Sequence, residues 1–227
     1  MEKKKYKLFL EVLGRFYEAG LLKNIILIGS WCLYFYENYF KGLNFTPTIR
    51  TRDIDFLVPI PPKLRQRVDI PELLKDLGFV LSFIGSKGYM RLDHPELIVE
   101  FLVPEKGKGT GKPFPLPEIG LNAQPLRYLD FLASNVIKIK VDNIVAKVPH
   151  PAAFALHKLI IHQRRAKPEK ANKDLEQALM ILSFLIKNDE QPVIRNTFNS
   201  MPKQWQKNVL DSLKKAKAEE IIQILEK

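Results

Sequence analysis

The character of the sequence changes near Pro149, and this change constrains the fold more than any other feature. Before it, short runs rich in β-branched and aromatic residues end at Gly or Pro, which is typical of strands. After it, apolar residues recur at helical spacing and the strand pattern stops. We therefore expect an α+β fold with a mixed sheet flanked by helices in residues 1–148 and a helical C-terminal domain in residues 149–227.

The elements expected within this outline follow from periodicity and from the Gly and Pro residues that end each run. Strands are expected at 24–29, 53–58, 79–84, 89–93, 97–103, 136–141 and 144–148. Helices are expected at 3–20, 30–39, 70–77, 151–166, 168–187, about 190–200 and 202–226. Residues 104–118 are dense in Gly, Lys and Pro, and we expect an exposed loop there.

Composition narrows the compartment and the partners. The single cysteine, Cys32, excludes an internal disulfide and a multi-Cys zinc site, and its apolar surroundings predict a small buried side chain. No apolar stretch reaches the ~20 residues that cross a bilayer, and the charged start lacks signal-peptide features, so a cytoplasmic protein is expected. The formal net charge of +11 favours polyanionic partners, nucleic acid above all, although basic proteins without such partners are common.

Two carboxylates occur two residues apart in the expected strand 53–58. Side chains at this spacing point to the same face of a strand, so Asp53 and Asp55 lie together while Ile54 and Phe56 turn toward the core. Their negative charges repel one another, and a divalent cation between them relieves that repulsion. We interpret the pair as an anchor for Mg²⁺ in phosphoryl transfer; a solvated strand end is the alternative.

Glu100 is a third acid, placed in the middle of the apolar strand 97–103. A charge in such surroundings needs a partner. One candidate partner is a metal ion shared with Asp53 and Asp55, which requires the three carboxylates to converge. The alternative is a basic side chain, that of Arg52, Arg91 or Lys158.

The sequence Gly29-Ser30 ends one expected strand and opens a helix. Backbone N–H groups at such a helix start attract anions, and glycine lets the backbone approach a phosphate closely. Such turns are common, so the turn gains meaning only through its order with the acids that follow: strand, Gly-Ser, helix, then Asp-x-Asp, then Glu.

That order of motifs resembles the polymerase-β-like nucleotidyltransferase superfamily. The matching segments are Ile26-Leu-Ile-Gly29-Ser30, Thr51-Arg-Asp53-Ile-Asp55-Phe and Val99-Glu100-Phe. The spacing from Ser30 to Asp53 and the later Lys-Asp segment look most like the abortive-infection toxin branch and related GSLxxAP-type bacterial proteins. This chain departs from the pattern at Trp31-Cys32-Leu33, where smaller residues are commoner. The resemblance covers about residues 24–180.

The resemblance also implies roles for residues outside the acidic strands. It assigns Gly29, Ser30, Arg52, Lys158, Lys173 and Asp174 to nucleotide binding, beside Asp53, Asp55 and Glu100 as catalytic residues and metal ligands. Lys173 and Asp174 share one helix face, and a solvated charged face is the ordinary meaning of such a pair. For Lys158, the alternative is an ion pair with Glu100.

The resemblance therefore implies a nucleotidyltransferase-type mixed sheet followed by helices that close over the nucleotide. It implies a Mg²⁺-dependent enzyme that moves an NMP from an NTP to an acceptor hydroxyl and uses two metal ions. RNA, including a tRNA 3′ end, is the acceptor that the charge favours; protein and small molecules remain open. A toxin role, with a separate antitoxin as partner, follows from the family alone. The alternative is an inactive module of this fold that binds RNA or a protein.

Overall fold

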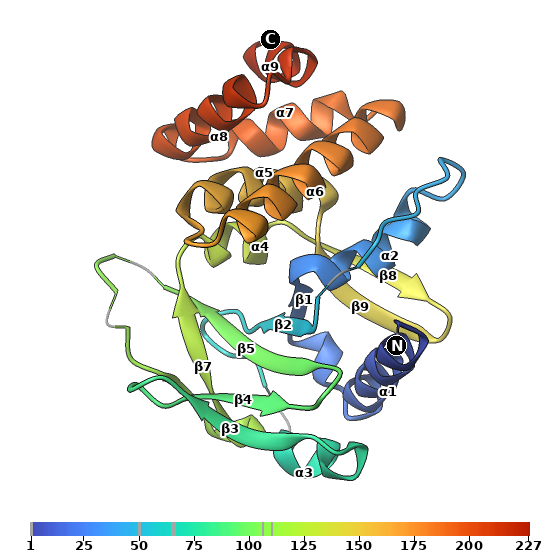
Figure 1. Ribbon diagram of the computed structural model, residues 1–227, viewed down its shortest axis with the longest axis vertical. Helices are drawn as coiled ribbons and strands as arrows, with labels where there is room; N and C mark the ends of the chain where they lie inside the picture. The colour runs from blue at the N-terminus through green and yellow to red at the C-terminus, as the bar shows by residue number, and fades with distance from the viewer. Residues whose placement is uncertain (1, 50, 65–66, 106, 110) are drawn as a thin grey trace. The chain divides into compact units, whose positions relative to one another are not determined.

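The computed structural model describes residues 2–49, 51–64, 67–105, 107–109 and 111–227, and it divides into two compact units (Figure 1). The first unit holds the residues up to Tyr39 together with Pro47–Val148, and the second holds Phe40–Thr46 and Pro149–Lys227. The sequence pattern places residues 40–46 with the sheet, whereas in the structure they group with the second unit. The rings of Phe40 and Phe45 contact Phe184, with centroids 5.7 and 4.9 Å away, so this short segment packs with the helices.

The first unit is built on a seven-stranded mixed sheet. Its central order is β1-β2-β5-β4-β3, and β7 joins β5 and carries β6. The pairs β2–β5 and β5–β7 are parallel and the other pairs are antiparallel. The strands are β1 (Ile26–Ile28), β2 (Asp53–Leu57), β3 (Val80–Ile84), β4 (Tyr89–Asp93), β5 (Ile98–Pro104), β6 (Phe114–Leu116) and β7 (Leu121–Leu126).

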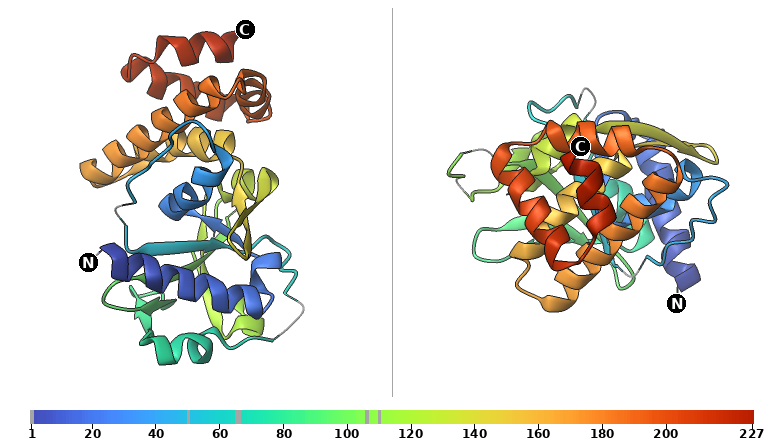
Figure 2. Two further views of the ribbon diagram at one scale, coloured as in Figure 1. Left: turned by 90° about the vertical axis from the view of Figure 1, so that its right-hand side faces the viewer. Right: turned by 90° about the horizontal axis from the view of Figure 1, so that it is seen from above.

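One face of this sheet is covered by α1 (Glu2–Glu18), which runs alongside β2 (Figure 2). Phe16 of α1 packs against Phe56 of β2 and Phe101 of β5, at 5.1 and 6.2 Å between ring centroids. All three rings are buried. Because side chains alternate along a strand, the neighbours of Phe56 and Phe101 are left on the opposite face, where the acids lie.

Three further helices and a hairpin complete the first unit. After the 3₁₀ turn Gly29–Trp31 comes α2 (Cys32–Tyr39), and the hairpin of β8 (Val136–Val141) and β9 (Ile144–Pro149) packs against it. Asn38 of α2 donates a hydrogen bond of 2.8 Å to the carbonyl of Lys140 in β8. The remaining helices are α3 (Ile70–Leu74) and α4 (Leu129–Ser134).

The second unit is helical. It contains α5 (Pro151–Ile161), α6 (Pro168–Lys187), α7 (Gln191–Asn199), α8 (Lys203–Lys215) and α9 (Glu219–Glu226). The long helix expected over 202–226 is wrong, because the chain leaves the helix at Lys217, whose φ is +54°. The helix expected over 151–166 ends early, at Ile161, and continues as the 3₁₀ turn His162–Arg164.

Three elements of the first unit, β6, β7 and α4, are not evident in the sequence pattern. The strand β7 alternates only over the four residues 121–124 before Pro125, which argues against a strand, and β6 falls within the segment expected to be a loop. Both strands owe their conformation to pairing with neighbours rather than to local preference. Among the described residues, no helix is both long and apolar enough to cross a membrane.

Candidate active site

The acidic pair lies on the face of the sheet that α1 leaves open. Along β2 the burial alternates, with Ile54 and Phe56 fully buried and Asp53 and Asp55 partly exposed. The two carboxylates therefore share a face, as the spacing predicts.

Parallel pairing brings the third acid to this face. Strands β2 and β5 run side by side with Asp55 opposite Glu100, so both side chains project to the same side of the sheet. On the other flank of β5, Arg91 of β4 is opposite Glu100. Arg91 in turn forms an ion pair of 2.9 Å with Asp93. The structure thus gathers Asp53, Asp55 and Glu100 into one polar face.

The Gly-Ser turn closes tightly on Asp55. In β1, Ile28 pairs with Asp55, which brings the next residue, Gly29, against the carboxylate. Gly29 has φ +72°, and a Cβ added to it would lie 2.5 Å from Oδ2 of Asp55. Only glycine fits this conformation and this contact without displacement. Ser30, which follows, is 8% exposed.

The bulky residues after the turn point into the core. The Trp31 ring stacks on Phe9 of α1 with centroids 3.9 Å apart, and both side chains are fully buried. Cys32 is buried and its thiol donates a hydrogen bond of 3.2 Å to the Leu27 carbonyl, which confirms the expected small buried side chain. The departure of Trp31-Cys32-Leu33 from the family pattern therefore serves packing beneath α1 and leaves the Gly29–Asp55 contact intact.

The donor set on this face fits a cation held by two carboxylates. Within the part of the chain that the structure describes, no three His, Cys, Asp or Glu side chains are arranged as a metal-binding group. Mg²⁺ is commonly held by one or two carboxylates, with waters and substrate phosphates completing its shell. Asp53 and Asp55 meet that requirement, and metal ligation by Glu100 stays a prediction.

Arg52 lies next to Asp53 and is exposed. Its Nη2 donates a hydrogen bond of 2.8 Å to the carbonyl of His94, and its own carbonyl accepts from the Ile98 amide. Both contacts hold the start of β2 against the start of β5. Nucleotide binding by Arg52 stays a prediction.

In the helical unit, three charged side chains form a compact network around Asp174 of α6. Lys158 Nζ of α5 lies 2.5 Å from Asp174 Oδ1, and Arg165 Nε lies 2.7 Å from Oδ2. Burial alone would raise the pKa of Asp174, but the two cations lower it below its ordinary value. The Lys158 and Asp174 side chains are each 6% exposed. Lys173, the residue before Asp174 on α6, is half-buried. The proposed roles of Lys158, Lys173 and Asp174 in nucleotide binding stay predictions.

His157 is buried beside this network and stays neutral. Burial, together with the positive charges of Lys158 and Arg165, lowers its pKa to about 3, and Asp174 offsets this only in part. Among the described atoms its Nε2 has no hydrogen-bond partner. His157 therefore belongs to the core of the helical unit.

Two partnerships of arginine are not evident in the sequence. From the sequence, Arg165 is expected either to contact phosphate or RNA or to be a solvated surface side chain. In the structure it forms an ion pair with Asp174. Arg91, a candidate partner of Glu100, also forms an ion pair with Asp93, whose carboxylate accepts a hydrogen bond from Ser82. The contacts among Ser82, Arg91 and Asp93 follow from strand pairing, since Ser82 of β3 is opposite Arg91 of β4. Only the register of these two strands could have predicted them.

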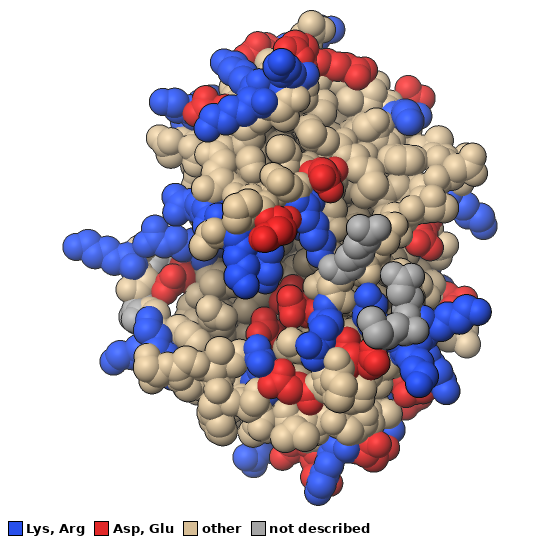
Figure 3. Space-filling model, in the orientation of Figure 1, with Lys and Arg blue, Asp and Glu red and all other residues tan. Residues whose placement is uncertain are grey.

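Charge of both signs occurs on the surface. On the face drawn in Figure 3, Lys and Arg are interspersed with Asp and Glu. The net charge of +11 therefore does not make this face uniformly basic.

A mixed sheet that presents an Asp-x-Asp strand beside a Gly-Ser turn, followed by a helical unit, defines a nucleotidyltransferase-type fold. The family model described as Nucleotidyltransferase matches residues 8–202, and the chain belongs to this family of enzymes. A search of curated proteins finds no match.

One solved structure of low sequence identity shares the fold, and two others resemble the chain more weakly. A nucleotidyltransferase-like antigenic protein from Paracoccidioides brasiliensis is 12% identical, with a TM-score of 0.51 over 96% of this chain and 92% of that one. The solution structure of the antibiotic-resistance factor ANT(2″)-Ia is 12% identical, with a TM-score of 0.49 over 88% and 94%. ANT(2″)-Ia with adenylyl-2″-tobramycin is 11% identical, with a TM-score of 0.45 over 85% and 97%.

Proposed function

We propose that this chain transfers a nucleoside monophosphate from an NTP to an acceptor hydroxyl and releases pyrophosphate. The observation that carries the proposal is the contact of Gly29 with Asp55, in which an added Cβ would lie 2.5 Å from the carboxylate. A phosphate held by the backbone of this turn would lie beside the acidic pair. Anion-binding amides and cation-binding carboxylates are the two parts that a metal-bound triphosphate requires.

Asp53 and Asp55 are the proposed Mg²⁺ ligands. Bound there, Mg²⁺ supplies positive charge that neutralises the triphosphate and the developing pyrophosphate. The amides of Gly29 and Ser30 bind the β- and γ-phosphates and hold the α-phosphate in line for attack. Arg52, Lys158 and Lys173 are proposed phosphate contacts, and Asp174 is proposed to orient Lys158 through their ion pair.

Glu100 is the proposed general base. Its carboxylate takes the proton of the acceptor hydroxyl while that oxygen bonds to the α-phosphorus, and the bond between the α-phosphorus and the bridging oxygen breaks. Its place beside Asp55 on the open face supports this role, since the base must lie near the phosphate under attack.

The acceptor that we favour is RNA, with a tRNA 3′ end as one form, because the chain carries a formal charge of +11. A protein or small-molecule acceptor is the competing proposal. Toxicity restrained by an antitoxin remains a proposal from the family resemblance. If this proposal holds, expression of the wild-type protein should arrest cell growth and expression of the Asp53→Asn variant should not.

The test is incubation with α-³²P-labelled NTPs, Mg²⁺ and total RNA or lysate, followed by separation of RNA, protein and small molecules. We expect label in one acceptor class, released pyrophosphate and no transfer with EDTA. Asp53→Asn/Asp55→Asn should reduce transfer by at least about 10³-fold.

A matched control is Asp76→Asn. Asp76 lies in the same unit, is exposed and forms an ion pair with Arg15. The variant should transfer label as the wild type does. Transfer that persists in the double variant would overturn the proposed site. Absence of both transfer and Mg²⁺-dependent NTP binding in the wild type would instead favour the inactive module.

A further inference from the structure

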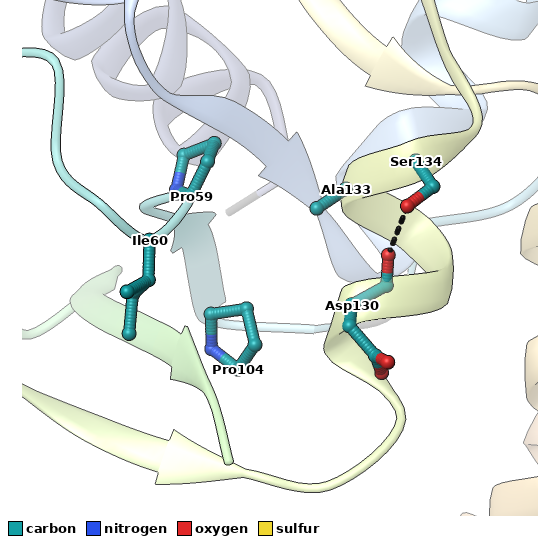
Figure 4. A pocket seen from close by; sticks show the side chains of 6 residues that line it. All are labelled: Pro59, Ile60, Pro104, Asp130, Ala133 and Ser134. Atoms are coloured by element: carbon teal, nitrogen blue, oxygen red, sulfur yellow. Dashed lines mark hydrogen bonds between the residues drawn. The ribbon is translucent and has the colours of Figure 1, made fainter. Parts of the chain in front are cut away.

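A pocket of about 450 Å³ lies at the opposite end of β2 from Asp53 (Figure 4). Its walls are Pro59 and Ile60 after β2, Pro104 at the end of β5, and Asp130, Ala133 and Ser134 of α4. Pro59 follows Asp53 by six residues and Asp55 by four, which is about 20 Å and about 13 Å along an extended chain. The pocket is therefore distinct from the proposed catalytic face, and its volume is that of a small-molecule site.

The walls combine apolar surface with hydrogen-bond acceptors. Two proline rings and Ile60, which is 46% exposed, offer flat apolar surface. Opposite them, Asp130 contributes a carboxylate, and the Ser134 hydroxyl donates to the Asp130 carbonyl at 2.9 Å, which leaves its oxygen free to accept (Figure 4). This chemistry suits a planar ring that carries N–H or O–H donors, such as a nucleobase with its ribose.

Three lysines gather in the same unit without a carboxylate among them. Burial and the positive charges of Lys138 and Lys63 lower the pKa of Lys147, so each of these two lysines lies close enough to repel Lys147. No salt bridge involves any of the three within the described residues. Lys147 Nζ also donates to the carbonyl of Lys23 at 2.5 Å, which fixes its position.

The hairpin explains this arrangement. Because β8 and β9 are joined by the two-residue turn Asp142–Asn143, Lys138 is placed directly opposite Lys147. Like charges at directly opposed positions destabilise a sheet. A polyanion that binds across them would relieve that repulsion and release its counterions.

The chain links these lysines to the pocket. Lys63 follows Ile60 by three residues, and Lys138 follows Ser134 by four. Segments of this length span at most about 14 Å. We call Lys63, Lys138 and Lys147 the lysine cluster. Two of its members, Lys63 and Lys138, are therefore each joined by a short segment to a residue that lines the pocket.

We propose that the pocket and the lysine cluster together bind single-stranded RNA, with one nucleotide in the pocket and its flanking phosphates on the lysines. An acidic protein would match the lysines but offers no planar ring for the pocket, and an anionic membrane would leave the pocket unused. This inference deepens the proposed function and rests on it, because it gives an RNA acceptor a docking surface remote from the site of transfer.

The test measures binding of a labelled single-stranded RNA oligonucleotide by fluorescence anisotropy at several salt concentrations. It uses the full chain carrying Asp53→Asn/Asp55→Asn, without NTP, so that binding is read independently of catalysis. Lys63→Gln/Lys138→Gln/Lys147→Gln should weaken binding about tenfold near 0.1 M salt. It should also reduce the slope of log K against log[salt] by about 2, at about 0.7 for each phosphate contact on a single strand.

Two further variants separate specific contacts from general charge. Lys207→Gln/Lys214→Gln/Lys215→Gln removes the same charge from exposed positions of α8 and should leave the slope unchanged. Ala133→Leu narrows the pocket and should weaken binding at least threefold with no change in slope. Thermal unfolding of each variant checks that it is folded.

Three results would overturn the inference. The first is equal loss of binding in the two lysine variants. The second is undetectable RNA binding in the parent protein. The third is binding to phosphatidylserine vesicles, lost in the lysine-cluster variant, with no binding of RNA. If RNA binds as expected while the NTP assay shows no transfer, the docking surface stands and the proposed transferase activity fails.

Discussion

Acidic residues are used in opposite ways in the two units. In the helical unit, Asp174 lies between Lys158 and Arg165, and the three form a largely buried network. On the sheet, Asp53, Asp55 and Glu100 share one partly exposed face, acid beside acid. The first arrangement favours the folded state, whereas the second adds like-charge repulsion that folding alone would not select. This contrast separates the carboxylates that serve structure from those that are available for a cation.

The largest effect on stability is expected from Asp174→Ala. Removing the acid leaves Lys158 buried without the carboxylate that pairs with it, and this should lower the free energy of unfolding by about 3–5 kcal/mol. Urea unfolding measures the change. The matched variant Lys158→Met/Asp174→Leu replaces the buried pair with apolar side chains, and its free energy of unfolding should fall by less than that of Asp174→Ala. A loss below about 1 kcal/mol for Asp174→Ala would remove the structural role of this acid.

His157 makes the same unit sensitive to acid. Its pKa is about 3 in the folded state against an ordinary value of 6.5, so between these values the unfolded chain binds a proton that the folded chain does not. The stability from neutral His157 is therefore complete above pH 6.5 and falls by about 1.4 kcal/mol for each pH unit as the pH drops toward 3.

His157→Leu should remove this part of the pH dependence. Urea unfolding of both proteins at pH 7 and pH 5 measures it, and the wild type should lose more stability than the variant. An identical loss in the two proteins would show that His157 titrates normally.

On the sheet side, Gly29→Ala tests whether the acidic face is functional. Both Gly29 and Gly88 have positive φ, +72° and +70°, but an added Cβ meets Asp55 only at Gly29. Each substitution should destabilise the fold by about 1–2 kcal/mol through backbone strain. Gly29→Ala should also reduce nucleotidyl transfer about 10²-fold, because it displaces the Asp55 carboxylate. Equal activities in the two variants, measured with labelled NTP, would contradict a functional contact.

The smallest effect on stability is expected from Asp53→Asn. This residue lies at the open face and at the first position of β2, so its free energy of unfolding, measured in urea, should change by less than about 0.5 kcal/mol. Transfer of label should nevertheless be lost. A destabilisation above about 2 kcal/mol would assign Asp53 to the structure, as Asp174 is, and the two units would no longer differ in this respect.

Much of the fold could be predicted from local pattern. Strand β2 and helix α6 lie where alternation and helical spacing predict them, since Pro59 ends one and Pro168 begins the other. Strand β7 could not be predicted, because its conformation depends on the strands that it pairs with. Residues 40–46 likewise depend on neighbours in space, since they join the helical unit through aromatic contacts with Phe184. The break at Lys217 could not be predicted because the left-handed position that ends α8 is occupied by Lys, where Gly or Asn is the usual signal.

Local sequence was enough to place Asp53 and Asp55 on one face, because a strand alternates its side chains with a period of two. It was also enough to place a glycine before Ser30 at the end of a buried strand. Tertiary contacts were needed to bring Glu100 beside Asp55, to press Gly29 against the Asp55 carboxylate, and to pair Asp174 with Lys158 and Arg165. These contacts join residues 9 to 45 positions apart, so strand register and helix packing set them, and no local preference encodes either.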